Sequence, residues 1–599
     1  MKILCYKVVQ LFVVLLLFNT SLFSDDNLIQ QVNKLSQTKQ WHRLLHFKNG
    51  KSEIDDLKFF FAKNGKTNPK AELKAFIEKL ISDKSDDENS TQCYYPSRSS
   101  WILEQLPQLQ EELKKPKCQA LKRELKSLGA KHVTLILASA HINSPASAFG
   151  HTFLRIDNNP NTPLLSYAVN YAAQTAEDNG FIYAYQGLFG GYKGRYSIDP
   201  YYKKLKEYSD LEQRNVWEYS LDLSQKEINK MVRHIFEIRH FYADYFFLTE
   251  NCSYNLLWLL EIAKPNINLI QQFNYKAIPI DTLRAVISEN LVKETTYRAS
   301  KRKKILNIAE PIKNTPQALE FSKSNEYNLT QIKNLSKKEK IASLELATAL
   351  LRIKLSNQEI NKKEYLPKFL NILNNRSKLG VIPKRKIKET ISPIQGHYSS
   401  KISLTYGKNQ ELTASFKPAY HDIYDNENGY SSGAYISFLE ADIQYKNRKL
   451  SIEEINILDI RSYTIQDAIF KPISWQVSLG AKRIFNHELN AYLQTGGGLT
   501  LGNEKLYTYA TITPTIYYKK QEELSISANL GLLYNPSKNL KFGLMGFNEW
   551  FDKNREILEV EPFVTYSFDQ AHALNLKYEY KKIKTKQEED ITLSWFWYF

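Results

Sequence analysis

From about residue 390 to the C-terminus, apolar and polar residues alternate with a period of two. Such alternation is typical of strands with one apolar and one polar face. The clearest apolar positions are Leu524, Ile526, Ala528, Leu530, Leu532 and Tyr534, then Leu574, Leu576, Tyr578 and Tyr580, then Ile591, Leu593, Trp595, Trp597 and Phe599. About twelve such segments predict an antiparallel β-barrel over residues 389–599.

The predicted strands are roughly ten residues long, rich in aromatic residues and even in number, which is the pattern of an outer-membrane barrel. A soluble β-sandwich or barrel also shows this alternation. Two features favour the membrane. The last strand is aromatic and ends at Phe599, and the N-terminus has the organisation of a signal peptide.

Residues 1–24 form the expected signal peptide. Lys2 and Lys7 supply its charged end, residues 8–18 supply a short apolar core, and Ser24 is a small residue suited to cleavage. The apolar run is short for a membrane-spanning helix, although an uncleaved anchor is the alternative. We therefore expect an exported protein of the cell envelope, with the barrel in the outer membrane and a periplasmic domain.

Export determines how the cysteines are interpreted. After removal of Cys5 with the signal peptide, Cys93, Cys118 and Cys252 remain. Cys93 and Cys118 lie 25 residues apart in similar proline-containing loops, so we expect them to form a disulfide. Cys252 is then a free thiol in an oxidising compartment.

The remaining chain divides into three parts by its periodicity. Residues 25–115 have helical spacing and predict an α-helical N-terminal domain. Residues 116–300 mix strand and helix patterns and predict an α+β domain. Residues 301–388 predict a helical connector, whose initial basic run, 301–304, we interpret as a solvated linker.

The net charge of +17 is spread along the chain. We interpret it as a solvated basic surface, with attraction to anionic lipid as the second interpretation, and expect no nucleic-acid partner. His42 and His46 share a helix face without further ligands nearby, so we interpret them as surface or packing residues. The sequence shows no metal cluster and no cofactor motif. The glycine-rich segment 189–197 lacks the context of a phosphate loop, and we expect it to form a wall or lid of an active site.

Cys252 lies where an aromatic run becomes an apolar helical pattern, so we expect it at the start of a helix that ends near Ala263. A helix N-terminus lowers the pKa of a thiol and favours the reactive thiolate. Backbone N–H groups at this point, with the Asn251 side chain as a candidate, are suited to hold an oxyanion.

A base for this thiol must come from elsewhere in the chain. His151 lies on a predicted strand that forms a hairpin with 164–171, in which position 151 opposes about position 169 or 170. Asn170 is therefore the candidate to orient the imidazole, and Ser166 is the weaker one. His141, on the preceding loop, is a candidate pocket residue.

Two sequence blocks resemble a known family. Residues 146–155 (ASAFGHTFLR) and 250–254 (ENCSY) look like the signature blocks of the Lnb-type periplasmic domain family. That family resembles circularly permuted papain-like proteins, which include NlpC-related hydrolases and lecithin:retinol acyltransferase. The resemblance covers about residues 115–300 and implies a papain-like fold in which the His strand precedes the Cys helix. Family members implicated in lipoprotein N-acylation carry a helical membrane region, whereas this chain ends in strands.

Together these features predict an outer-membrane-associated thiol acyltransferase or acyl hydrolase. Cys252 forms an acyl-thioester in this hypothesis, His151 acts as the base, and Asn170 orients it. A membrane lipid or a lipoprotein is the expected substrate. The alternatives are a cell-wall peptidase or amidase of the NlpC type, and a non-enzymatic barrel protein with an inert periplasmic domain.

Overall fold

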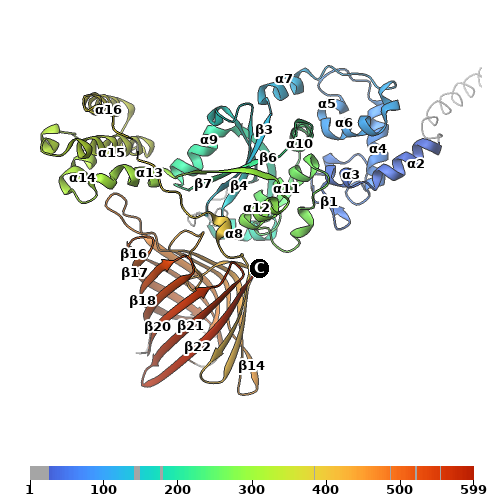
Figure 1. Ribbon diagram of the computed structural model, residues 1–599. Helices are drawn as coiled ribbons and strands as arrows, with labels where there is room; N and C mark the ends of the chain where they lie inside the picture. The colour runs from blue at the N-terminus through green and yellow to red at the C-terminus, as the bar shows by residue number, and fades with distance from the viewer. Residues whose placement is uncertain are drawn as a thin grey trace, which may run out of the picture. The chain divides into compact units, whose positions relative to one another are not determined.

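The computed structural model describes residues 26–140, 149–175, 180–324, 326–383, 385–485, 488–519, 522–552 and 555–599. The expected signal peptide lies outside these residues. The chain divides into two compact units (Figure 1). The first comprises Met1–Leu137, His151–Leu205 and Glu218–Thr296, and the second comprises Ala138–Gly150, Lys206–Trp217 and Tyr297–Phe599.

The first unit is organised around a seven-stranded sheet with the order β8-β6-β5-β4-β3-β7-β9. The strands are β3 (His132–Ala138), β4 (His151–Asp157), β5 (Tyr167–Gln174), β6 (Tyr192–Pro200), β7 (Val216–Leu221), β8 (Ala243–Tyr245) and β9 (Val292–Arg298). The central strands β3 and β4 are buried at every residue after the first. Near-continuous burial of this kind is expected of strands covered on both faces.

Helices cover this sheet, and α11 (Cys252–Ala263) is buried at every residue. It packs against β4, β5 and three other helices, α3, α10 and α12. The other helices of the unit are α2 (Asp26–Ser36), α3 (Lys39–Leu44), α4 (Pro69–Ser82), α5 (Thr91–Tyr94), α6 (Pro96–Gln105), α7 (Gln119–Leu128), α8 (Gly180–Phe189), α9 (Tyr201–Leu205), α10 (Gln225–Ile238) and α12 (Pro279–Ser288).

The N-terminal helices, with the small hairpin of β1 (Phe47–Lys48) and β2 (Lys51–Ser52), belong to the same compact unit as the sheet. Arg98 on α6 is fully buried, and its guanidinium contacts Glu72 on α4 at 3.1 Å and Glu237 on α10 at 2.6 Å. Buried charges persist only when they are paired in this way. The predicted disulfide between Cys93 and Cys118 is confirmed.

In the segment Tyr297–Phe599 of the second unit, four described α-helices precede the barrel. They are α13 (Lys301–Ala309), α14 (Pro316–Lys323), α15 (Lys337–Ser356) and α16 (Lys362–Ser377). The basic run 301–304 is the first turn of α13, where Arg302 contacts Asp467 at 2.6 Å and lies over the Phe470 ring. The interpretation of this run as a solvated linker was therefore wrong, because an ion pair and a ring contact hold it. Among the described residues, no helix has both the length and the apolar character needed to cross a bilayer.

Twelve strands then close into an antiparallel barrel, as predicted. Closure occurs where β10 pairs with both β11 and β22, and β11 pairs with β13. The twelve are β10 (Lys401–Gly407), β11 (Glu411–Lys417), β13 (Ala434–Lys446), β14 (Lys449–Ser462), β15 (Ser474–Arg483), β16 (Leu489–Gly502), β17 (Leu506–Tyr518), β18 (Glu522–Ser537), β19 (Leu540–Phe551), β20 (Arg555–Ser567), β21 (His572–Ile583) and β22 (Lys586–Tyr598). A short strand, β12 (Ala419–His421), pairs with one end of β13.

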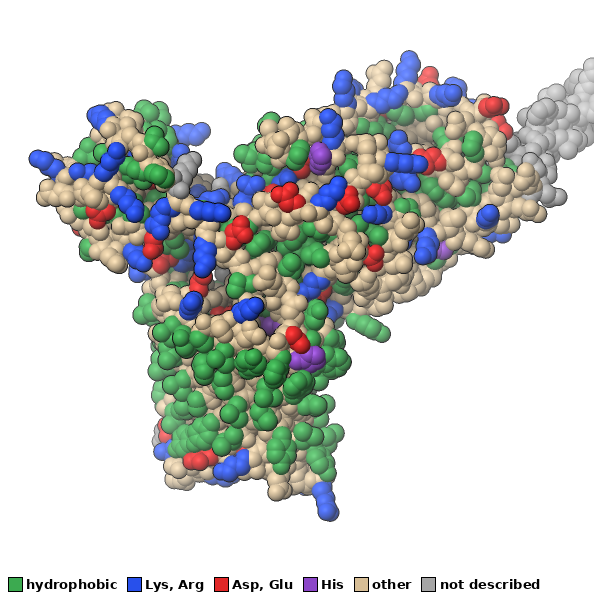
Figure 2. All heavy atoms as spheres, viewed as in Figure 1, with side chains coloured by type: hydrophobic (Ala, Val, Ile, Leu, Met, Phe, Trp, Pro, Cys, Tyr) green, Lys and Arg blue, Asp and Glu red, His purple; other side chains and the backbone are tan. Residues whose placement is uncertain are grey.

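The barrel has an apolar exterior and a polar interior, and Figure 2 shows the apolar exterior on one face. On β17, Ile512 and Ile516 are 60% and 47% exposed, whereas Thr513 and Thr515 are buried. Fully burying one such apolar side chain is worth about 1.5–3 kcal/mol, so an exterior of this kind is stable in lipid and unfavourable in water. The apolar exterior therefore excludes the soluble β-barrel, which the alternation of apolar and polar residues in the sequence also allowed.

A loop between β12 and β13 folds into one end of the barrel. Asp425 accepts hydrogen bonds from Lys401 on β10 and Tyr598 on β22, both at 2.8 Å. Glu427 accepts from Lys541 on β19 at 3.1 Å and from Asn535 on β18 at 3.1 Å. We call residues 422–428 the plug, since their carboxylates bridge strands from different sides of the ring.

Replacing the Asp425 carboxylate should destabilise the barrel. Asp425→Ala leaves two buried ammonium groups, those of Lys401 and Lys417, with Asp422 as their remaining acidic partner. We expect a loss of about 3–5 kcal/mol, the usual effect of breaking a buried pair. Urea unfolding in detergent, followed by tryptophan fluorescence, measures it. Asp569→Ala, at an exposed turn, is the control, and equal midpoints for the two variants would contradict the plug's role.

Candidate active site

The candidate nucleophile, Cys252, is the first residue of α11, as predicted. Its side chain is buried, with 3% of the residue exposed. It is the free cysteine among the described residues. The thiol therefore lies at the positive end of a helix that is held on all sides by the core.

Asn251 caps this helix rather than facing a substrate. Its side-chain oxygen accepts hydrogen bonds from the Ser253 and Tyr254 backbone N–H groups, at 3.0 and 3.2 Å. Its amide nitrogen donates to the carbonyl oxygens of Phe247 and Ala277, at 3.0 and 2.6 Å. Both amide hydrogens are thus in use, so the expectation that Asn251 holds an oxyanion is not supported, and the residue is a helix N-cap.

His151 is the first residue of β4, and its Nε2 lies 2.7 Å from the Asn170 side-chain oxygen. The structure thus brings together the two residues that the hairpin pattern suggested. The register is shifted, however, because Leu154 opposes Val169, and continuing this register places position 151 opposite position 172. Asn170 is then the diagonal neighbour of His151 on the same face, still within side-chain reach.

The environment of Cys252 favours its thiolate. Burial raises the pKa of the thiol, but the charge of His151 and hydrogen bonds from His151, the Thr152 backbone and Tyr245 outweigh it, and the pKa falls to about 7. A substantial fraction of the thiol is then ionised at neutral pH, which is the form that attacks a carbonyl or binds an alkylating reagent.

Tyr245, on β8, completes the group and was not identified from the sequence. Its hydroxyl oxygen accepts a hydrogen bond from the Cys252 backbone N–H at 3.2 Å. Burial holds the pKa of Tyr245 well above its usual range, so the hydroxyl keeps its proton and remains a donor. The sequence offered one signal, a tyrosine on a short strand seven residues before the cysteine, but only the fold of the 246–251 segment brings the two together.

Of the two other predicted pocket residues, Ser166 is not part of this group. Ser166 is buried, and its hydroxyl donates to Asp157 at the end of β4. His151 begins the same strand, roughly 20 Å away at the usual rise per residue, so Ser166 does not orient it. His141 lies outside the described residues.

The glycine-rich segment 189–197 is not a loop but the end of α8 followed by β6. The expectation that this segment forms a wall or lid of an active site stays a prediction. Just before it, α8 packs on Phe247, four residues before Asn251. A Cβ at Gly187 would lie 2.2 Å from the Phe247 ring, and a Cβ at Gly190 2.3 Å from Phe246. These glycines allow the two aromatic rings to approach the backbone.

Two groups of described residues have side chains close enough to share a cation, and both belong to the second unit. They are His397, His421 and Asp425, and Glu559, Glu561 and Glu579. Lysines already neutralise both groups. Lys401 and Lys417 contact Asp425, and the glutamates contact Lys577 and Lys581. We therefore interpret them as structural ion-pair networks of the barrel.

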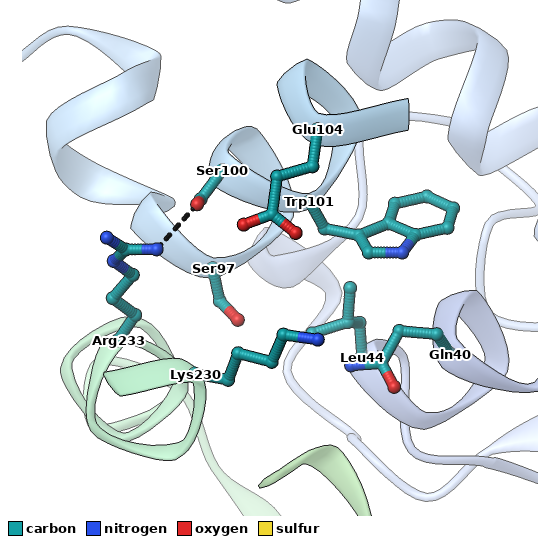
Figure 3. Close-up of a pocket in the computed structure, with 8 residues that line it drawn as sticks. All are labelled: Gln40, Leu44, Ser97, Ser100, Trp101, Glu104, Lys230 and Arg233. Carbon is teal, nitrogen blue, oxygen red and sulfur yellow. Dashed lines mark hydrogen bonds between the residues drawn. The ribbon is translucent and has the colours of Figure 1, made fainter. Parts of the chain in front are cut away.

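A small pocket in the first unit is separate from Cys252 (Figure 3). Its volume of about 20 Å³ holds about one water molecule. Arg233 on α10 donates to the Ser100 hydroxyl at 2.7 Å across one side of it. The lining residues are Gln40, Leu44, Ser97, Ser100, Trp101, Glu104, Lys230 and Arg233. Its size rules it out as a substrate site.

Three parts of the chain match family models. Residues 120–289 match the Lnb N-terminal periplasmic domain, which confirms the resemblance predicted from the two sequence blocks. Residues 33–105 and 390–598 match domains of unknown function, DUF7843 and DUF7840. None of the curated proteins matches the chain. The chain is an outer-membrane protein with a periplasmic domain, as predicted.

The chain also resembles solved outer-membrane structures at low identity. The KdgM porin has 10% identity and a TM-score of 0.22, with 34% of this chain and 99% of that chain covered. An outer membrane channel from Pseudomonas putida F1 has 10% identity and a TM-score of 0.23, with 34% and 96% covered. The DcaP channel of Acinetobacter baumannii has 8% identity and a TM-score of 0.19, with 34% and 96% covered.

The rate of alkylation of Cys252 should follow the ionisation of the thiol. Because the thiolate is the reactive form, the rate with iodoacetamide should rise with pH around a midpoint of about 7. His151→Ala removes the stabilising charge and keeps the burial, so its midpoint should move to higher pH. Peptide mass spectrometry without reductant measures both, and the disulfide keeps Cys93 and Cys118 unlabelled as an internal control. Identical midpoints would contradict the contact with His151.

Proposed function

We propose that the first unit is a thiol acyltransferase or acyl hydrolase, with Cys252 as its nucleophile. The observation that carries this proposal is the arrangement of the site: Cys252 is buried at the start of α11, its backbone N–H is bonded to Tyr245, and the His151 that contacts the thiol is held by Asn170 at 2.7 Å. This arrangement lowers the pKa of the thiol to about 7. A buried structural cysteine in apolar surroundings has a raised pKa and is inert. A lowered pKa at a buried site is therefore a mark of chemistry rather than of packing.

The proposed reaction has two steps. His151 takes the proton of the Cys252 thiol, and the sulfur attacks the carbonyl carbon of an ester or amide. The carbon–oxygen or carbon–nitrogen bond then breaks as the leaving group takes that proton from His151. An acyl-thioester on Cys252 results. An amine or water then attacks this thioester while His151 accepts its proton, which releases the acyl product and regenerates the thiol. An amine acceptor makes the reaction a transfer, and water makes it a hydrolysis.

Asn170 supports the base in this proposal. Its side-chain oxygen accepts a hydrogen bond from the Nε2–H group of His151, at 2.7 Å. The neutral imidazole therefore keeps the tautomer in which Nδ1 carries no proton and is the acceptor. Nδ1 is then the nitrogen available to the thiol. Fixing the tautomer and orientation of the base is the role that the third member of a catalytic triad plays.

In this proposal Tyr245, rather than Asn251, donates a side-chain hydrogen bond to the oxyanion. An oxyanion formed beside Cys252 can accept a hydrogen bond from the Tyr245 hydroxyl, whose oxygen is held by the Cys252 backbone N–H at 3.2 Å. The stacked ring of Tyr171, with its centroid 5.7 Å from that of Tyr245, holds the phenol in place. Donors fixed in advance at a water-poor site stabilise a tetrahedral intermediate strongly.

The barrel favours a lipid or a lipoprotein as the substrate. It anchors the enzyme in a membrane, so acyl donors in that membrane are present at a high effective concentration.

Loss of the nucleophile should abolish the covalent intermediate. We expect the intact mass of the purified protein to increase by one acyl group after exposure to native membranes, and Cys252→Ala to show no adduct. Cys252→Ser is the conservative control, since it keeps the volume of the site. An adduct of equal yield in Cys252→Ala would overturn the assignment, and release of peptides from peptidoglycan would favour an amidase instead.

Removal of the Tyr245 hydroxyl should slow the reaction without unfolding the protein. Tyr245→Phe keeps the stacked ring and should reduce the rate of adduct formation by about 10²–10³-fold, the usual effect of losing one oxyanion donor. Tyr242→Phe, on a half-buried tyrosine three residues earlier, is the matched control. A Tyr245→Phe rate equal to that of the control would remove this residue from the mechanism.

A further inference from the structure

One face of α8 presents apolar side chains to the outside. Tyr185 and Phe189 are 65% and 69% exposed, and their ring centroids lie 4.8 Å apart. Ile182, one turn earlier, is 43% exposed. Spacings of three and four residues place these side chains on one helix face. We call Ile182, Tyr185 and Phe189 the α8 stripe.

The opposite face of α8 is fixed to the segment that carries the nucleophile. The Phe247 backbone N–H donates to the Gly187 carbonyl oxygen at 2.8 Å, and the Tyr183 ring lies 5.2 Å from the Phe247 ring. The Phe247 carbonyl in turn accepts the Asn251 amide at 3.0 Å. The stripe therefore has a rigid connection to the helix cap beside Cys252.

The chemistry of the stripe suits a lipid interface. The sequence of α8, GFIYAYQGLF, contains no charged residue, so neither face carries groups that must stay in bulk water. Exposed aromatic rings in contact with each other mark an interaction surface rather than ordinary polar surface. Tyrosine and phenylalanine favour the boundary between headgroups and acyl chains.

The bilayer in which the barrel is embedded is the partner that we consider for the stripe. Three apolar side chains alone bind a bilayer weakly. The same chain is anchored in a membrane by its barrel, so the bilayer is present at a high effective concentration, and a weak surface is then sufficient.

We propose that the α8 stripe inserts into the interface of the membrane that holds the barrel. It then places the Cys252 site where the acyl carbonyls of membrane lipids lie. The proposed contact with lipid depends only on the α8 stripe and on the anchoring of the chain by its barrel. The proposed placement of Cys252 at lipid acyl carbonyls rests in addition on the proposed function.

Site-directed fluorescence on the full chain tests this contact. Phe189→Cys, and separately Tyr185→Cys, are made in a Cys252→Ala background and labelled with nitrobenzoxadiazole. The protein is reconstituted into vesicles of phosphatidylethanolamine and phosphatidylglycerol that carry a shallow doxyl-labelled lipid. Leu165→Cys is the matched control, since Leu165 is 82% exposed and follows the far end of β4. The background lacks the nucleophile, so the result is independent of any activity.

We expect quenching by the doxyl lipid to be roughly threefold or more stronger at 185 and 189 than at 165, together with a blue shift of the emission. High salt should leave most of this quenching in place, because the contact is mainly apolar. Equal quenching at all three positions would overturn the proposal. Protection from iodide without quenching by lipid would also overturn it, and would assign the stripe to a protein partner.

Discussion

The side chain of Asn251 fixes the start of α11, and the geometry of the candidate site depends on it. One amide group binds the first turn of the helix, the carbonyl of Phe247 and the carbonyl of Ala277. The chain before the helix and the chain before α12 are thus joined at one point. Because Cys252 follows directly, a shift of this cap would move the sulfur away from both His151 and Tyr245.

The features that follow from short-range patterns could be predicted from the sequence. The period of two predicted the twelve-stranded barrel, because outward residues such as Ile512 and Ile516 of β17 alternate with inward ones such as Thr513 and Thr515. Export and the count of cysteines gave the disulfide between Cys93 and Cys118. The transition from an aromatic run to a helical pattern placed Cys252 at a helix start. In each case the controlling interactions are local or depend on composition.

What could not be predicted depends on contacts between distant segments. Tyr245 reaches Cys252 only because the chain between them turns back, and no spacing rule encodes that turn. From the sequence, the Asn251 side-chain amide could be expected to face a substrate. In the structure it donates a hydrogen bond to the carbonyl oxygen of Ala277, 26 residues later, a contact that the sequence does not indicate. The α8 helix was not predicted, because glycines are typical of loops, whereas Gly187 within α8 and Gly190 directly after it are required by the rings of Phe247 and Phe246.

The plug has a consequence for the order in which the barrel is assembled. Its carboxylates precede β13 in the chain, yet their partners Lys541 and Tyr598 lie on β19 and β22. Until those strands are in place, Asp425 and Glu427 lack these partners, and Lys541, which is fully buried in the finished barrel, has no carboxylate to neutralise it. Plug docking and ring closure therefore stabilise each other in the finished barrel.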